Sequence, residues 1–147
     1  MKKVTKEYII EVLKNIRSLR SKTAKDDMPF SIKIDDLREL CDDKWSTDLD
    51  KYWEASLKSN EEYYNDLESS IIKNGWDSKE PCEVSIIESP PKNGILISDG
   101  MHRLCVYIRN KLKNDIPIVV RYTTLEQDMI AITHPTHIKW YDIEETI

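Results

Sequence analysis

The chain has 147 residues, of which 39% are hydrophobic and 33% are charged, and its formal net charge at pH 7 is −5. This length fits one domain with a buried core, and the negative charge argues against a surface that binds nucleic acid as a whole, while leaving room for a local basic patch. The apolar runs are all too short to span a membrane, and Glu7 and Glu11 interrupt the region where a signal peptide would need its apolar core.

An amphipathic helix is predicted over residues 5–19, with Thr5 as its N-cap. Its apolar stripe consists of Ile9, Val12, Leu13, Ile16 and Leu19. The other face is rich in lysine and arginine, and we interpret it as a solvated face rather than a nucleic-acid contact. A polar loop ending at Pro29 follows, so residues 1–29 form an N-terminal helix and loop.

A first strand is predicted over residues 30–37, after which the chain becomes acidic. Carboxylates occur at Asp35, Asp36, Glu39, Asp42, Asp43, Asp48 and Asp50. We interpret most of them as solvated loop residues. The alternative is that one or two of them face a phosphate site and act on a substrate hydroxyl or a metal ion.

Two helical segments are predicted over residues 50–74, with a break at Ser59 or Asn60 and a capping box of Ser59 and Glu62. Aromatic residues are concentrated in this region, at Trp45, Tyr52, Trp53, Tyr63 and Tyr64. We interpret them as core or lid packing, with stacking against a nucleobase as the alternative. After a strand at residues 83–87, the Asn93–Gly94 pair predicts a hairpin turn.

Residues 95–108 combine an apolar strand, a tight turn at Asp99 and Gly100, and a helix. A helix that starts at a glycine turn exposes its first N–H groups and their partial positive charge, which together favour an anion. His102 and Arg103 lie on the first turn, away from the apolar face, and can add donors to the same anion. Asp99 can hold a metal ion or take a proton there. The alternative is that His102 caps or packs and that Arg103 pairs with an acidic residue of the preceding loop.

The sequence of this turn, Asp99-Gly100-Met101-His102-Arg103, resembles the DG-x-HR signature of the ParB/sulfiredoxin-like superfamily. Residues 67–76 are similar to its L-x-x-SI-x-x-x-G helix and turn, and residues 114–120 to its closing IPV-x-V strand. The resemblance covers about residues 30–122 and leaves residues 123–147 as a C-terminal extension. We expect an α+β fold, with helices on a small mixed sheet built from strands near Phe30, Val84, Ile95 and Ile116.

In motif, the chain is most similar to the free-serine-kinase type members of this superfamily. The resemblance implies a phosphotransferase that uses ATP or ADP with Mg²⁺ to phosphorylate a small hydroxyl-bearing molecule. Asp99 would hold the metal or act as base, and His102 would stabilise the transferring phosphoryl group. The phosphates would bind Gly100, Met101, His102 and Arg103. Those kinases have a catalytic glutamate shortly after the first strand, to which Glu39, Asp42 or Asp43 could correspond.

The sequence departs from two groups of this superfamily, and each departure excludes the function of that group. Met101 stands where sulfiredoxins have their catalytic cysteine, which excludes sulfinic-acid repair, and Cys105 is predicted to be a buried small hydrophobe. Partition proteins of the ParB type have Glu and Arg in place of Met101 and His102, followed by a helix-turn-helix domain that we do not expect here. The alternative to an enzyme is a CTP-type nucleotide-binding module that regulates association with DNA or protein. Asp99 favours the enzyme, because phosphates repel a carboxylate unless a metal bridges them.

The extension is predicted to contain a short helix over residues 125–132 and a turn at His134-Pro135-Thr136-His137. We interpret the turn as structural or substrate-contacting, because Pro135 disfavours the helix on which two histidines would share a metal. Trp140 and Tyr141 are expected to cover an edge of the core. The three widely spaced cysteines indicate neither a disulfide framework nor a metal site, so the cytoplasm is the expected compartment.

Overall fold

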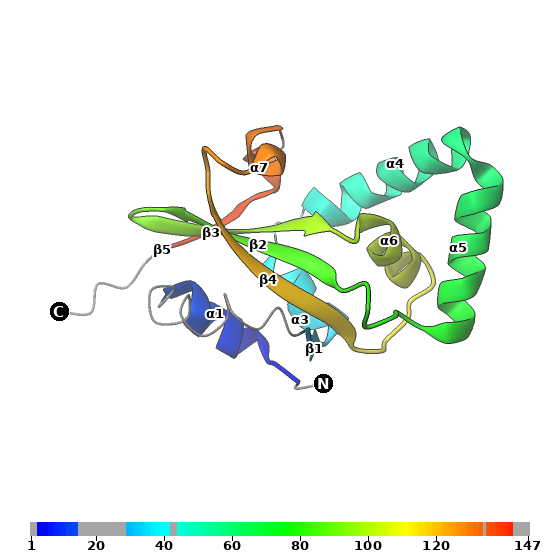
Figure 1. Ribbon diagram of the computed structural model, residues 1–147, viewed down its shortest axis with the longest axis horizontal. Coiled ribbons are helices and arrows are strands. Elements are labelled where there is room, and N and C mark those ends of the chain that lie inside the picture. The colour runs from blue at the N-terminus through cyan, green and yellow to red at the C-terminus, as the bar shows by residue number, and fades with distance from the viewer. Residues whose placement is uncertain (1–2, 15–28, 42–43, 134, 143–147) are drawn as a thin grey trace.

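The computed structural model describes residues 3–14, 29–41, 44–133 and 135–142, and this part has an α+β fold around a mixed sheet (Figure 1). The strands are β1 (Phe30–Ile32), β2 (Cys82–Ser89), β3 (Lys92–Asp99), β4 (Ile116–Thr124) and β5 (Lys139–Asp142). Their order in the sheet is β1-β4-β2-β3-β5, in which β2 and β4 are parallel and the other neighbours antiparallel. The predicted α+β class is confirmed, and the sheet has strands at all four predicted positions, near Phe30, Val84, Ile95 and Ile116.

Helices cover both faces of this sheet. They are α1 (Lys6–Lys14), α3 (Ile34–Leu40), α4 (Lys44–Ser59), α5 (Glu61–Asn74), α6 (Met101–Arg109) and α7 (Met129–Thr133), followed by the 3₁₀ helix η1 (Pro135–His137). Figure 1 shows α1 and α3 on one side of the strands and α7 on the other. Within the described ranges, no helix combines the length and the apolar character needed to cross a membrane.

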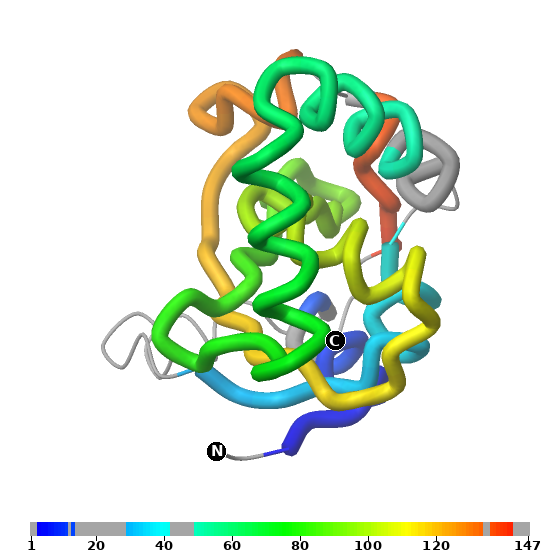
Figure 2. Tube along the Cα trace, turned by 90° about the vertical axis from the view of Figure 1, so that its right-hand side faces the viewer, coloured from blue at the N-terminus to red at the C-terminus, as the bar shows by residue number. Residues whose placement is uncertain are grey.

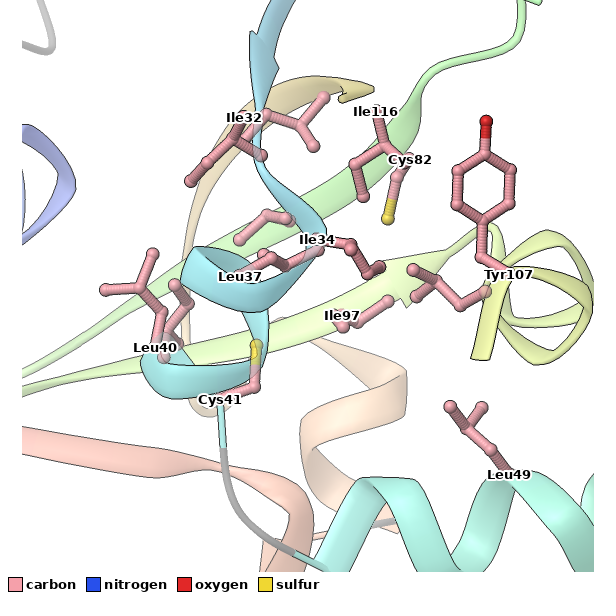
Figure 3. Close-up of a cluster of buried hydrophobic side chains, with 14 of the residues drawn as sticks. Ile32, Ile34, Leu37, Leu40, Cys41, Leu49, Cys82, Ile97, Tyr107 and Ile116 are labelled. Carbon is pink, nitrogen blue, oxygen red and sulfur yellow. The ribbon is translucent and has the colours of Figure 1, made fainter. Parts of the chain in front are cut away.

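The main hydrophobic core lies between the sheet and α1, α3, α4, α5 and α6. Figure 3 shows how α3 contributes Leu37 and Leu40, while Tyr107 comes from α6 and Leu49 from α4. The side chain of Trp53 on α4 is also fully buried there. A second, smaller cluster consists of Ile87, Leu96, Ala131 and Ile138.

The N-terminal helix begins as predicted, because Thr5 Oγ1 accepts a hydrogen bond from Tyr8 N at 3.3 Å. Ile9 and Leu13 of its apolar stripe are buried. The rest of the predicted helix, from residue 15 to residue 19, lies outside the described residues.

The first predicted strand is wrong from residue 33 onwards. Strand β1 has only three residues, and α3 follows it, with Ile34, Leu37 and Leu40 buried at helical spacing. The alternation of Ile32 and Ile34 is typical of a strand, but the spacing of the next apolar residues is helical, and packing against the sheet favours the helix.

The predicted hairpin turn at Asn93–Gly94 is also wrong, because both residues pair with β2 inside β3. The turn is made by Pro90 and Pro91. Prolines suit this position because they lack the N–H group that a strand needs to pair with its neighbour, and a turn does not need that pairing. Gly94 serves a different purpose: a β-carbon there would collide with Ile138 and would lie 3.0 Å from the Trp140 ring.

The break between the two central helices is confirmed, but the predicted capping box is not formed. Asn60 is the N-cap of α5, and its side chain accepts a hydrogen bond from Tyr63 N at 3.2 Å. Ser59 instead donates to Ser56 O at 2.7 Å. Helix α4 begins at Lys44, six residues earlier than predicted.

The C-terminal extension is part of the sheet. Its β5 pairs with β3, and its helix α7 is shorter than predicted and packs on the smaller hydrophobic cluster. Tyr141 packs against the main core and donates its hydroxyl to Leu40 O at 2.7 Å, whereas Trp140 is 37% exposed. The extension therefore supplies the fifth strand.

Candidate functional site

The Asp99–Gly100 turn joins the end of β3 directly to α6. Gly100 has a φ of +97°, and a β-carbon there would lie 3.2 Å from both Cys82 Cα and the Trp76 ring, so the turn requires glycine. The first hydrogen bond of the helix runs from Leu104 N to Gly100 O at 3.0 Å. The N–H groups of residues 101–103 therefore precede the helical ladder, as an anion site requires.

Asp99 is exposed, and its Oδ1 accepts a hydrogen bond from Gly100 N at 2.8 Å. The carboxylate thus caps the turn that it precedes. It also acts electrostatically on two neighbouring side chains, because it favours the protonated forms of His102 and Tyr52. Asp99 is therefore close enough to His102 and Tyr52 to act on both, and the rings of His102 and Tyr52 contact each other.

The side chain of His102, which was predicted to lie away from the apolar face and to add a donor to the anion, is partly buried. Its ring lies between Tyr52 of α4 and Tyr64 of α5, with centroid distances of 4.6 and 4.7 Å and interplanar angles of 32° and 34°. Its Nε2 lies 2.9 Å from Ser56 Oγ. Burial, and then the positive charge of Arg103, lowers the pKa of His102, against the opposing effect of Asp99. The neutral imidazole is therefore favoured.

The three helices that supply these side chains contact one another pairwise at one end of the sheet. Figure 1 shows α4 above α6 and α5 to its right, and Figure 2 shows α5 crossing in front when the molecule is viewed from that end. Burial, followed by Tyr64, Cys105 and Asp99, raises the pKa of the Tyr52 phenol. Tyr52 and Tyr64 therefore place aromatic rings against His102 on the side of the site that faces α4 and α5.

Arg103 forms an ion pair with Glu80, which lies in the loop before β2. That loop is fixed by two hydrogen bonds, from Trp76 Nε1 to Glu80 O at 2.7 Å and from Glu80 N to Asp77 O at 3.1 Å. The Trp76 ring packs edge-on against Tyr107 of α6. The guanidinium at the helix start therefore has an internal carboxylate partner.

The structure does not bring Glu39 together with Asp99. The Glu39 carboxylate pairs with Lys6, a hydrogen-bonded contact that lowers the pKa of Glu39, and its backbone oxygen accepts from Lys139 Nζ at 2.8 Å. Lys139 pairs with Ile95, four residues before Asp99 in β3. The other two predicted carboxylates, Asp42 and Asp43, lie outside the described residues.

The part of the chain that the structure describes contains no group of three or more His, Cys, Asp or Glu side chains arranged to hold a metal ion. His134 lies outside that part, and His137 belongs to η1.

Sequence analysis did not identify Ser56 or Glu80 as part of the site. It also did not predict that Tyr52 and Tyr64 contact His102. The one available signal was the spacing of Tyr52 and Ser56, which lie four residues apart and so share a helix face. Their approach to residue 102 depends on how α4 crosses α6, which no local pattern encodes.

Comparison of the chain with protein-family models, with curated proteins and with solved structures gave no match.

Proposed function

We propose that the N-terminus of α6 binds the phosphates of a nucleotide and that the protein is a phosphotransferase. It would use ATP or ADP to phosphorylate a small hydroxyl-bearing molecule. The observation that carries this proposal is that three groups occur together at the Gly100 turn: the N–H groups of residues 101–103, which precede the helical ladder, the Arg103 guanidinium and the Asp99 carboxylate.

The phosphate part of the site would consist of backbone and side-chain donors. The N–H groups of Met101, His102 and Arg103 lie at the positive end of the helix dipole, which favours an anion. Arg103 would add a planar fork suited to phosphate oxygens once Glu80 releases it. Positioning and charge stabilisation are the main tasks of a protein in phosphoryl transfer, and this arrangement supplies both.

Mg²⁺ fits the residues around this turn. Proteins usually hold Mg²⁺ with one or two carboxylates, the remaining ligands being water and substrate phosphates. Asp99 is an exposed carboxylate beside the proposed phosphate position, and it would hold the ion. The ion, when bound, would neutralise negative charge on the phosphates. Glu39 has no role in this scheme, because its carboxylate pairs with Lys6.

The cytoplasm is the compartment that we propose, since nucleoside triphosphates and free thiols both belong there. The cysteines of the chain, Cys41, Cys82 and Cys105, all lie in the described part, are buried and form no disulfide bond.

A thermal-shift experiment tests the nucleotide site. ATP, ADP, CTP and GTP would each be added with and without Mg²⁺ to the wild-type protein and to Arg103→Ala. A ligand that binds only the folded state raises Tm. At a free concentration of a hundred times Kd, it adds about 2.7 kcal/mol to the free energy of unfolding. We expect one adenine nucleotide to raise Tm in the wild type and not in the variant.

A turnover assay separates the enzyme from a binding module. Asp99→Asn should retain nucleotide binding and lose product formation with a panel of small alcohols and hydroxy acids. Binding of CTP without turnover would instead support a module that regulates association with DNA or protein. Absence of any Tm shift would remove the nucleotide site altogether.

A further inference from the structure

Ser56 is the buried polar residue that joins α4 to the start of α6. Its hydroxyl oxygen lies 2.9 Å from Tyr52 O in its own helix and 2.9 Å from His102 Nε2, a residue 46 positions away in the chain. The residue is 8% exposed, so water has little access to this pair of contacts. Both hydrogen bonds must therefore be satisfied by the single hydroxyl group.

The hydroxyl has one proton, and this fixes the direction of both hydrogen bonds. A backbone carbonyl can only accept, so Ser56 must donate its proton to Tyr52 O. The second contact then requires His102 Nε2 to carry a hydrogen and to donate it to Ser56 Oγ. The neutral imidazole is thereby assigned as the Nε2–H tautomer, in which Nδ1 carries the lone pair.

The surroundings of the ring hold it in this orientation. Tyr52 and Tyr64 pack against it from α4 and α5, so a flip of the imidazole would have to displace two tyrosines. Asp99 and Arg103 are the charged groups that act on it, with opposite signs. Within the described residues, Nδ1 makes no hydrogen bond.

We propose that Ser56 is a positioning residue, which holds His102 as the Nε2–H tautomer and leaves Nδ1 as the proton-accepting atom of the site. This inference rests on the proposed phosphotransferase. The acceptor O–H would give its proton to Nδ1 while its oxygen forms a bond to the terminal phosphorus of the nucleotide. The bond from that phosphorus to the bridging oxygen breaks, its electron pair leaves with the shortened nucleotide, and the imidazolium returns its proton to water.

The first test needs no nucleotide. Side-chain ¹⁵N NMR of the full chain distinguishes protonated from unprotonated imidazole nitrogens, and His102→Gln assigns the signals among the three histidines. We expect Nε2–H and a bare Nδ1 in the wild type near neutral pH. Ser56→Ala should move both nitrogen signals towards the averaged positions of two exchanging tautomers, and Ser56→Thr, which keeps the hydroxyl, should restore the wild-type pattern.

Two NMR results would overturn this assignment: a wild-type His102 that carries its proton on Nδ1, or a Ser56→Ala protein whose nitrogen signals match the wild type. The backbone amide spectrum checks that each variant is folded. A wild type that shows the expected tautomer but binds no nucleotide would refute the proposed function and leave the tautomer assignment supported.

Kinetics supply the second test. A general base contributes about 10²- to 10⁴-fold to a rate, so the loss of its positioning should lower kcat by a smaller factor, about 10-fold. KM for the nucleotide should stay unchanged, because Ser56 does not touch the phosphate position. Ser56→Thr should recover most of kcat. An unchanged kcat in Ser56→Ala would contradict the positioning role.

Discussion

Arg103 is the strongest side-chain donor at the start of α6, and it forms an ion pair with the exposed carboxylate of Glu80. An incoming phosphate would have to displace that carboxylate. We predict that Glu80→Gln increases nucleotide affinity, because an exposed ion pair is worth about 0.2–1 kcal/mol, which corresponds to about 1.4- to 5-fold in Kd. Titration calorimetry with the nucleotide identified by thermal shift would measure it.

The other end of the same helix offers a matched control. Arg109 Nε lies 3.4 Å from Glu68 Oε2, in an ion pair between α6 and α5 that is remote from the Gly100 turn. Glu68→Gln should leave nucleotide affinity unchanged. Equal effects of Glu80→Gln and Glu68→Gln would mean that the affinity reflects overall charge rather than competition for Arg103.

His102 should make stability depend on pH. Burial lowers the pKa of His102 in the folded protein below the ordinary 6.5, so the unfolded chain binds this proton more readily. The stability that neutral His102 contributes is complete above pH 6.5 and is lost as the pH falls through the lower folded-state pKa. Urea unfolding of wild type and His102→Gln between pH 7.5 and about 5 should show a steeper acid loss in the wild type. Parallel curves would contradict the prediction.

The residues of the turn could be predicted because they are consecutive. Asp99, Gly100 and the start of α6 follow from a strand pattern, a glycine and a helical pattern that touch one another in the sequence. The environment of His102 could not be predicted in the same way. Ser56 and Tyr64 reach it from other helices, so its burial and tautomer depend on tertiary packing.

At the scale of elements, α3 and β5 are joined by hydrogen bonds at the end of the helix. Tyr141 Oη donates to Leu40 O, and Lys139 Nζ donates to Glu39 O. These donors satisfy two of the carbonyls that every helix leaves without a partner at its C-terminus. Strand β5 therefore caps the helix that follows β1.

We predict that Tyr141→Phe lowers the free energy of unfolding by about 0.5–1.5 kcal/mol, the usual net value of one hydrogen bond. Urea denaturation would measure it. Tyr63→Phe is the control, because Tyr63 is 58% exposed and keeps its ring contact with Tyr64 after the change. A loss of equal size in both variants would mean that the bond to Leu40 O contributes nothing specific.

The two wrong element predictions share a physical cause. Residues 30–37 satisfy a strand pattern at their start and a helix pattern at their end, and long-range packing decides where one gives way to the other. Asn93–Gly94 has the composition of a turn, but glycine is needed at position 94, which lies opposite Trp140 where β3 pairs with β5. For Gly94 the deciding contacts come from a distant segment, because a β-carbon there would meet Ile138 and Trp140.

At the scale of the whole molecule, the sheet separates two hydrophobic clusters of unequal size. The larger one takes side chains from nearly every element, whereas the smaller one joins Ile87 and Leu96 of the central strands to Ala131 and Ile138 of the extension. The family resemblance that we expect from the sequence ends near residue 122, before the segment that completes this second cluster. The extension is therefore integral to the described fold, although its sequence gives no strong strand pattern.

The two isoleucines of the extension test this integration. Ile138 is 4% exposed and Ile132 is 51% exposed, so the same substitution probes a buried and a surface site. We predict that Ile138→Ala lowers the free energy of unfolding by about 2–5 kcal/mol. Ile132→Ala should change it by less than about 0.5 kcal/mol. Both would be measured by urea denaturation, followed by tryptophan fluorescence and by circular dichroism.

The shape of the transition is as informative as its midpoint. If the extension unfolds with the rest of the molecule, both probes should give one coincident transition in Ile138→Ala, shifted to lower urea. Separate transitions, or a loss in Ile138→Ala as small as that in Ile132→Ala, would mean that the segment after residue 122 folds independently of the sheet. In that case the site at Gly100 would depend on the other four strands and not on β5. A single transition would instead mean that the stability of β3, and with it the position of Asp99, depends on its pairing with β5.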